Sequence, residues 1–261
     1  MTTAATQHGS GPHPSGLDYL TLLERLQDAF HDSIAGVDPG SRVPGCGDWT
    51  AGELVEHLSH IHRWAGAQAR AQDAHQADAV PGGPAERYAA RAAELRETLH
   101  DLAPDATARV LAHPEPLGPG PASFWHRRQV HETLVHLHDL RAAAAGSAHL
   151  DLVTDVPPEV WADAVDEVVT VFQPRQVGLG RMAPLRVHVL LVAEDSPGAS
   201  WVLGLPDPDR AQEIVPDVTV TGTARALALL LWRRLTPQEA GVTVNGDRQD
   251  LDEALAEPIV P

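Results

Sequence analysis

Four long amphipathic segments, separated by stretches rich in proline and glycine, fill the first half of the chain. Their periodicity predicts four helices, at about residues 17–34, 50–71, 85–102 and 124–145. Thr50-Ala51-Gly52-Glu53 has the pattern of a capping box at the start of the second helix, and Gly146 can end the fourth. Helices of this length, connected by short breaks, favour a four-helix bundle.

The second half of the chain changes character. We expect helices at about 157–172 and 223–234, and strands at 185–192, 200–203, 217–221 and 242–244. Strands and helices mixed in this way are typical of a small α+β domain. The two patterns meet within 147–156, so we expect an α+β protein of two domains, 17–150 and 151–261. The polar tail at 1–16 is expected to be disordered.

Charge and apolar content exclude several classes of partner. The net charge of -17 argues against binding to nucleic acid or to an anionic membrane. The longest apolar run, 226–232, is far too short to span a bilayer, and the polar N-terminus lacks the apolar core of a signal peptide. A single cysteine excludes an internal disulfide. We therefore expect a cytoplasmic protein, either a monomer or a homodimer.

All 19 basic residues are arginine, and this excludes chemistry that depends on lysine. Schiff bases, anchored pyridoxal phosphate and the phosphate-binding Walker lysine all require a lysine amine. The composition, rich in arginine, alanine and proline, is typical of a high-GC genome and indicates an actinobacterial source. Cys46 precedes the second helix, whose dipole could lower the pKa of its thiol, but no partner base is evident. We expect Cys46 to be a spectator.

The second helix carries two histidines beside its apolar stripe, which Leu54, Leu58 and Ile61 mark. At about 100° per residue, His57 and His62 lie on opposite flanks of this stripe. Such a position suits a metal ligand that reaches into the bundle. It also suits a histidine whose hydrogen bonds are satisfied at the edge of the core, and the two interpretations stay open.

The fourth helix places a carboxylate and an imidazole one turn apart. Glu132 and His136 are spaced i, i+4, so their side chains share one face, while Val130, Leu134 and Leu137 line the opposite one. Such a pair can chelate one metal ion if its face lines a cleft inside the bundle. The alternative is a polar face exposed to solvent.

Short motifs in both halves of the chain form a recognisable set. In the first half they are Asp48-Trp49-Thr50, 53–58, 62–65, Arg127-Arg128, 131–133, 135–136 and Asp139. In the second half they are 163–167, 218–222 and 229–234. With these motifs the chain resembles the mycothiol-dependent maleylpyruvate isomerase family over roughly residues 17–250. The resemblance implies a DinB-like four-helix bundle followed by a small α+β domain related to sterol carrier proteins.

The resemblance also implies functional residues. The family's metal ligands fall on His57, Glu132 and His136, and its C-terminal arginine falls on Arg234, which could clamp a carboxylate of the thiol or the substrate. A solvated arginine at a helix end is the alternative for Arg234. The chain has His138 where the family often has an aromatic residue. Such departures leave the electrophilic substrate open.

Three ligands of the types His, His and Glu leave positions open, as reactive metals require. Zinc is the first choice, and nickel, iron or another divalent ion stays open. We expect mycothiol to bind the metal as a thiolate and to attack a small electrophile, giving either isomerisation or S-conjugation. No catalytic residue of the chain itself is identified. The alternatives are a hydrolase that uses a metal-bound hydroxide, and a non-catalytic protein that binds a metal or a small molecule.

Overall fold

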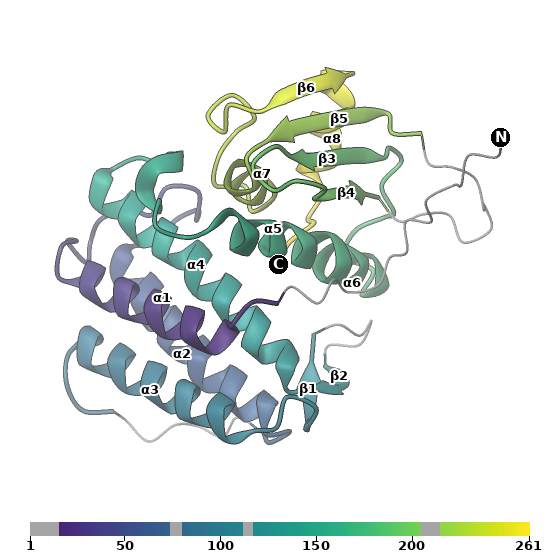
Figure 1. Ribbon diagram of the computed structural model, residues 1–261. Coiled ribbons are helices and arrows are strands. Elements are labelled where there is room, and N and C mark those ends of the chain that lie inside the picture. The colour runs from purple at the N-terminus through teal and green to yellow at the C-terminus, as the bar shows by residue number, and fades with distance from the viewer. Residues whose placement is uncertain (1–15, 74–79, 112–116, 205–214) are drawn as a thin grey trace.

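The computed structural model describes residues 16–73, 80–111, 117–204 and 215–261. The expected disordered tail lies outside the described residues, apart from Gly16. Figure 1 shows a bundle of helices, formed by the first half of the chain, beside a small sheet with its own helices, formed by the second half. This arrangement confirms the predicted α+β class.

The four predicted helices of the first half are all present. They are α1 (Tyr19–Ile34), α2 (Ala51–Ala69), α3 (Pro84–Asp101) and α4 (Ser123–Ala145). The expected capping box closes the start of α2, and Gly146 takes the left-handed conformation after α4, with a φ of 75°. Helix α1 packs against α3 and α4, and α2 packs against α3 and α4.

Helix α4 is buried on nearly all sides, which the sequence did not indicate. Its polar residues Arg128, Glu132 and Asp139 are only 5%, 9% and 0% exposed. The alternative of a solvated polar face is therefore wrong. The helix is enclosed because α1 and α2 cover one side, while side chains of the second half contact the other.

A short antiparallel hairpin between α3 and α4 was not predicted. It pairs β1 (Thr107–Val110) with β2 (Gly118–Pro121), a segment that the sequence marked only as a break. Gly120 is required there, because a Cβ at this position would lie 2.5 Å from a methyl carbon of Val110. The indole Nε1 of Trp125 donates to the carbonyl of Arg109 at 2.8 Å and so ties the hairpin to α4.

The first helical region of the second half is longer than predicted. After a 3-10 turn at Leu150–Leu152, the chain forms α5 (Pro158–Glu167), a π-helical turn (Val168–Phe172) and α6 (Gln173–Gly178). The expected end at 172 is wrong because the π turn leads directly into α6, so the chain stays helical to Gly178. A proline lacks the backbone N–H that a helix interior uses, but it is tolerated in a first turn such as that of α6.

The sheet of the second half has the strand order β4-β3-β5-β6. Its strands are β3 (Val189–Ala193), β4 (Ser200–Leu203), β5 (Val218–Gly222) and β6 (Thr243–Gly246). The central pair β3–β5 is parallel, and the outer pairs are antiparallel. The strand expected at 185–192 begins only at Val189.

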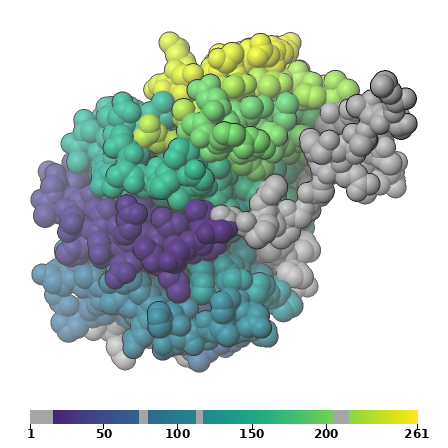
Figure 2. Space-filling view, in the orientation of Figure 1, coloured from purple at the N-terminus to yellow at the C-terminus, as the bar shows by residue number. Residues whose placement is uncertain are grey.

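Two helices support this sheet. Helix α7 (Ala224–Leu231) packs against β3 and β5, and it matches the apolar helix that the sequence predicted. Helix α8 (Arg248–Ala256), which packs against β5, was missed, although Asp247 caps it by accepting from the N–H of Gln249. In Figure 1, α5 lies between the bundle and the sheet. Figure 2 shows the two halves in direct contact on the face that it presents.

Within the described ranges, no helix combines the length and the apolar character that crossing a bilayer requires.

Candidate metal centre

Helices α2 and α4 bring three potential metal ligands together. Nε2 of His57 lies 3.7 Å from Oε1 of Glu132, and Nε2 of His136 lies 3.3 Å from the same oxygen. One ligand atom from each of the three residues falls within 4.8 Å of the others. In the part of the chain that the structure describes, this is the one cluster of three such side chains with that spacing.

The spacing fits a divalent ion. Zinc binds imidazole nitrogen and carboxylate oxygen at about 2.0–2.2 Å, so two ligand atoms in a tetrahedral set lie about 3.3–3.6 Å apart. The two distances from Glu132 Oε1, 3.3 and 3.7 Å, match this separation. The donors, two imidazoles and one carboxylate, are also those that zinc and related metals take.

A second carboxylate fixes the orientation of His136. Oδ2 of Asp139 lies 3.0 Å from Nδ1 of His136. A proton on Nδ1 then leaves the lone pair of Nε2 directed towards Glu132. Metal-binding histidines commonly pair their second nitrogen with a carboxylate in this way.

The cluster opens to solvent on the side of His57. The side chain of His57 is 31% exposed, whereas those of Glu132 and His136 are each 11% exposed. The ring of Trp49 meets the ring of His57 edge to face, with 4.7 Å between their centroids. Of the three side chains, His57 is therefore the most accessible to solvent.

The charges of the cluster shift one another's pKa values. Burial raises the pKa of Glu132, but Arg128 and His136 outweigh it, and the pKa falls well below its ordinary value. Burial lowers the pKa of His136, but Glu132 and Asp139 raise it to about 9 overall. In the absence of metal, His136 is thus protonated at neutral pH, and its imidazolium ring faces the carboxylate of Glu132. A divalent cation would displace this proton, so binding should weaken as the pH falls.

Comparison with known protein families agrees with this architecture. The family model of the mycothiol maleylpyruvate isomerase N-terminal domain matches residues 21–141, and the model of the MDMPI C-terminal domain matches residues 159–253. The chain belongs to the mycothiol maleylpyruvate isomerase family.

Two solved structures share the fold of this family member. They are crystal structures of mycothiol-dependent maleylpyruvate isomerase and of a histidine-to-alanine mutant, with TM-scores of 0.54 and 0.59. Each is 17% identical to this chain, and each alignment covers 89% of this chain and 93% of the other. Among curated protein sequences, none matches the chain.

In this family member, the C-terminal arginine is joined to the ligand cluster. Nε and Nη2 of Arg234 donate to the two oxygens of Asp139 at 2.8 and 2.9 Å, and Nη1 donates to the carbonyl of Trp232. Its side chain is 13% exposed, so the alternative of a solvated arginine is wrong. Arg234 also borders a cavity of about 640 Å³. Binding of a substrate carboxylate by Arg234 stays a prediction.

The single cysteine lies beside a buried carboxylate. Sγ of Cys46 lies 3.4 Å from Oδ2 of Asp139. Burial, together with the charge of Asp139, raises the pKa of the Cys46 thiol to about 12. This shift is opposite to the one that a helix dipole would give, and it agrees with a spectator role.

We expect Cys46 in the native protein to resist alkylation by iodoacetamide at pH 8. A thiol of pKa about 12 is almost entirely protonated there, whereas the thiolate is the reactive species. The rate can be followed by mass spectrometry, with the urea-unfolded protein as the control that should react fast. Equal rates in both states would contradict this placement.

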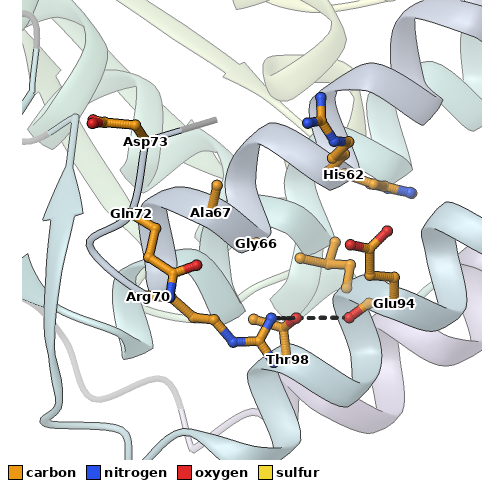
Figure 3. Close-up of a pocket in the computed structure, with 10 residues that line it drawn as sticks. His62, Gly66, Ala67, Arg70, Gln72, Asp73, Glu94 and Thr98 are labelled. Carbon is orange, nitrogen blue, oxygen red and sulfur yellow. Dashed lines mark hydrogen bonds between the residues drawn. The ribbon is translucent and has the colours of Figure 1, made fainter. Parts of the chain in front are cut away.

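His62, the other histidine beside the apolar stripe of α2, is part of the buried core. It is fully buried, and Nε2 lies 3.3 Å from the hydroxyl of Thr133. Burial lowers the pKa of His62 to about 3, so the ring is neutral. It also borders a cavity of about 180 Å³ between α2 and α3, shown in Figure 3, where Arg70 donates to Thr98. None of the three proposed ligands lines this cavity.

Proposed function

We propose that this chain is a metal-dependent enzyme that uses mycothiol as a cosubstrate to transform a small electrophile. One observation carries the proposal: His57, Glu132 and His136 converge with a spacing that suits one divalent ion. Family membership supports the choice of mycothiol, because the family is named for mycothiol-dependent isomerisation.

Each proposed ligand has a defined part. His57 and His136 would bind through Nε2 and Glu132 through Oε1, since these atoms face one another. A divalent cation at these atoms, with zinc as the first choice, would lower the pKa of a coordinated thiol so that it reacts as a thiolate near neutral pH. Asp139 holds His136 in the orientation that this binding needs.

The chain is not required to supply a nucleophile. Its only thiol, that of Cys46, is protonated at neutral pH because its pKa is raised to about 12. Its lack of lysine removes amine catalysis. These features remove two common protein nucleophiles, while hydroxyl and carboxylate side chains remain, and they agree with a nucleophilic role for the thiol cosubstrate. The solved relatives are named as maleylpyruvate isomerases, so cis-trans isomerisation of a conjugated acid is the first activity to test, with S-conjugation second.

The test is turnover with and without the thiol. Zinc-loaded protein should convert maleylpyruvate, or another activated alkene from a panel, only when mycothiol is present. Glu132→Gln, which keeps the shape of the ligand but removes its charge, should abolish conversion. His60→Ala is the matched control, because His60 lies exposed on the same helix as His57.

Two other outcomes would overturn the proposal. Conversion at the same rate without thiol would favour a metal-hydroxide hydrolase. Failure of every electrophile under both conditions would favour a non-catalytic binding protein.

A further inference from the structure

Arg128 connects the proposed ligand Glu132 to the second half of the molecule. It lies on α4, one turn before Glu132, and its side chain is 6% exposed. Nη2 contacts Oε2 of Glu132, and Nη1 donates to Oε2 of Glu167 on α5 at 2.9 Å. One guanidinium therefore joins a carboxylate of the bundle to a carboxylate of the α+β half.

Aromatic rings hold the guanidinium in place. Its central carbon lies 4.8 Å from the centroid of the Phe172 ring and 5.4 Å from that of the Trp232 ring. Both rings belong to the second half, and both are at least 90% buried. Cation–π contacts and two charge-assisted bonds leave Arg128 little freedom to turn.

Glu167, the second partner of Arg128, is itself fixed. Nδ1 of His131 lies 3.0 Å from Oε2 of Glu167, and Nε2 of His131 lies 3.0 Å from Oδ2 of Asp163. His131 is fully buried, and Glu167 is 1% exposed. The anchor for Arg128 is thus a buried group of ionisable side chains on α4 and α5.

Arg128 also gives the two carboxylate oxygens of Glu132 different partners. Oε2 is engaged by Arg128, whereas Oε1 is the atom that faces His57 and His136. A free carboxylate can bind a metal through one or both oxygens. When Oε2 is held elsewhere, only Oε1 is available, and a coordination position stays open for an exogenous ligand.

We propose that Arg128 is a positioning residue that limits Glu132 to one metal-binding oxygen and so preserves the position that the thiol occupies. This inference rests on the proposed function, because it concerns the same metal and thiol. Without Arg128, Oε2 of Glu132 becomes free to bind the ion and to compete with the thiol. The metal is retained in that case, but the affinity for the thiol falls.

The test compares Arg128→Gln with Arg127→Gln in the full-length protein. Arg127 also joins α4 to α5, through Asp163 and Asp166, but its bonds do not include Glu132. The Arg127→Gln variant therefore measures the effect of losing an ion pair between the two halves without any change at Glu132. In Arg128→Gln, Glu167 keeps its contact with His131, which favours folding of the variant.

Two measurements distinguish a positioning role of Arg128 from a general destabilisation of the protein. Cobalt(II) replaces zinc as a visible probe, since the positions and intensities of its visible bands depend on the number and kind of its ligands. Arg128→Gln should still bind about one cobalt ion, with visible bands that differ from those of the wild type because a carboxylate oxygen takes the open position, and its KM for mycothiol should rise about 10- to 100-fold, the size of the losses found when residues around metal ligands are changed. The spectrum and KM of Arg127→Gln should match those of the wild type.

A spectrum and a thiol KM for Arg128→Gln equal to those of Arg127→Gln would overturn the inference. If Arg128→Gln does not fold, Arg128→Lys decides, because a single ammonium group cannot hold both carboxylates as the guanidinium fork does. It should shift both readouts in the same direction, and unchanged readouts would again contradict the inference. Absence of thiol-dependent turnover in the wild type refutes the proposed function instead, while the cobalt spectra still test the role of Arg128.

Discussion

Replacement of His136 with alanine should remove most of the bound divalent metal, and thiol-dependent turnover with it. Nε2 of His136 lies 3.3 Å from Oε1 of Glu132, so its loss would leave two ligands, of which His57 is partly exposed. Two protein ligands do not retain zinc well against a chelator, since protein zinc sites generally use three or four. His57→Ala should have the same effect.

Metal content after dialysis against a weak chelator, measured by inductively coupled plasma mass spectrometry, checks this expectation. The wild type should hold about one ion per chain, and so should His60→Ala, whose side chain lies exposed on α2. Equal metal content in the wild type, His57→Ala, His136→Ala and His60→Ala would show that the ion, if any, binds elsewhere.

Asp139→Asn should lower the free energy of unfolding by about 3–5 kcal/mol, the usual cost of removing one partner of a buried ion pair. Asp139 is 0% exposed, and it accepts both bonds from Arg234 as well as a contact from His136. An asparagine offers one oxygen in place of two and turns an NH2 group towards a donor. Arg234 is then left buried without its counter-charge.

Urea unfolding in the presence of a chelator measures this cost separately from metal binding. The control is Asp48→Asn, because the pair of Asp48 with Arg42 lies at the surface and should contribute nothing measurable. Replacing both partners, with Asp139→Leu and Arg234→Met together, should restore much of the stability, since no charge then stays buried alone. A loss below about 1 kcal/mol in Asp139→Asn would contradict the expected role of this pair.

The sequence was sufficient to predict those elements that a local periodicity of apolar residues defines. The bundle helices α1 to α4 follow from their apolar spacing and their caps, and the shared face of Glu132 and His136 follows from their i, i+4 spacing. The hairpin β1–β2 could not be predicted in this way. Its second strand is made only of glycine and proline, residues that ordinarily interrupt strands.

The environment of the cluster could not be predicted from the sequence either. Asp139 and Arg234 are 95 positions apart, and Arg128 and Glu167 are 39 apart, so no local pattern indicates either contact. The periodicity of α4 could not decide between a polar face inside the protein and one exposed to solvent. Its polar residues point into the protein, where ion pairs from the second half compensate their burial.

X-ray absorption at the zinc edge tests the central proposal, a thiolate bound to the metal held by His57, Glu132 and His136. Zinc-loaded protein carrying Cys46→Ser is measured with and without mycothiol, so that the only thiol present is that of the cosubstrate. The proposed function predicts nitrogen and oxygen neighbours alone without mycothiol, and one added sulfur neighbour at about 2.3 Å with it. A spectrum that shows no sulfur at saturating mycothiol would contradict the proposal.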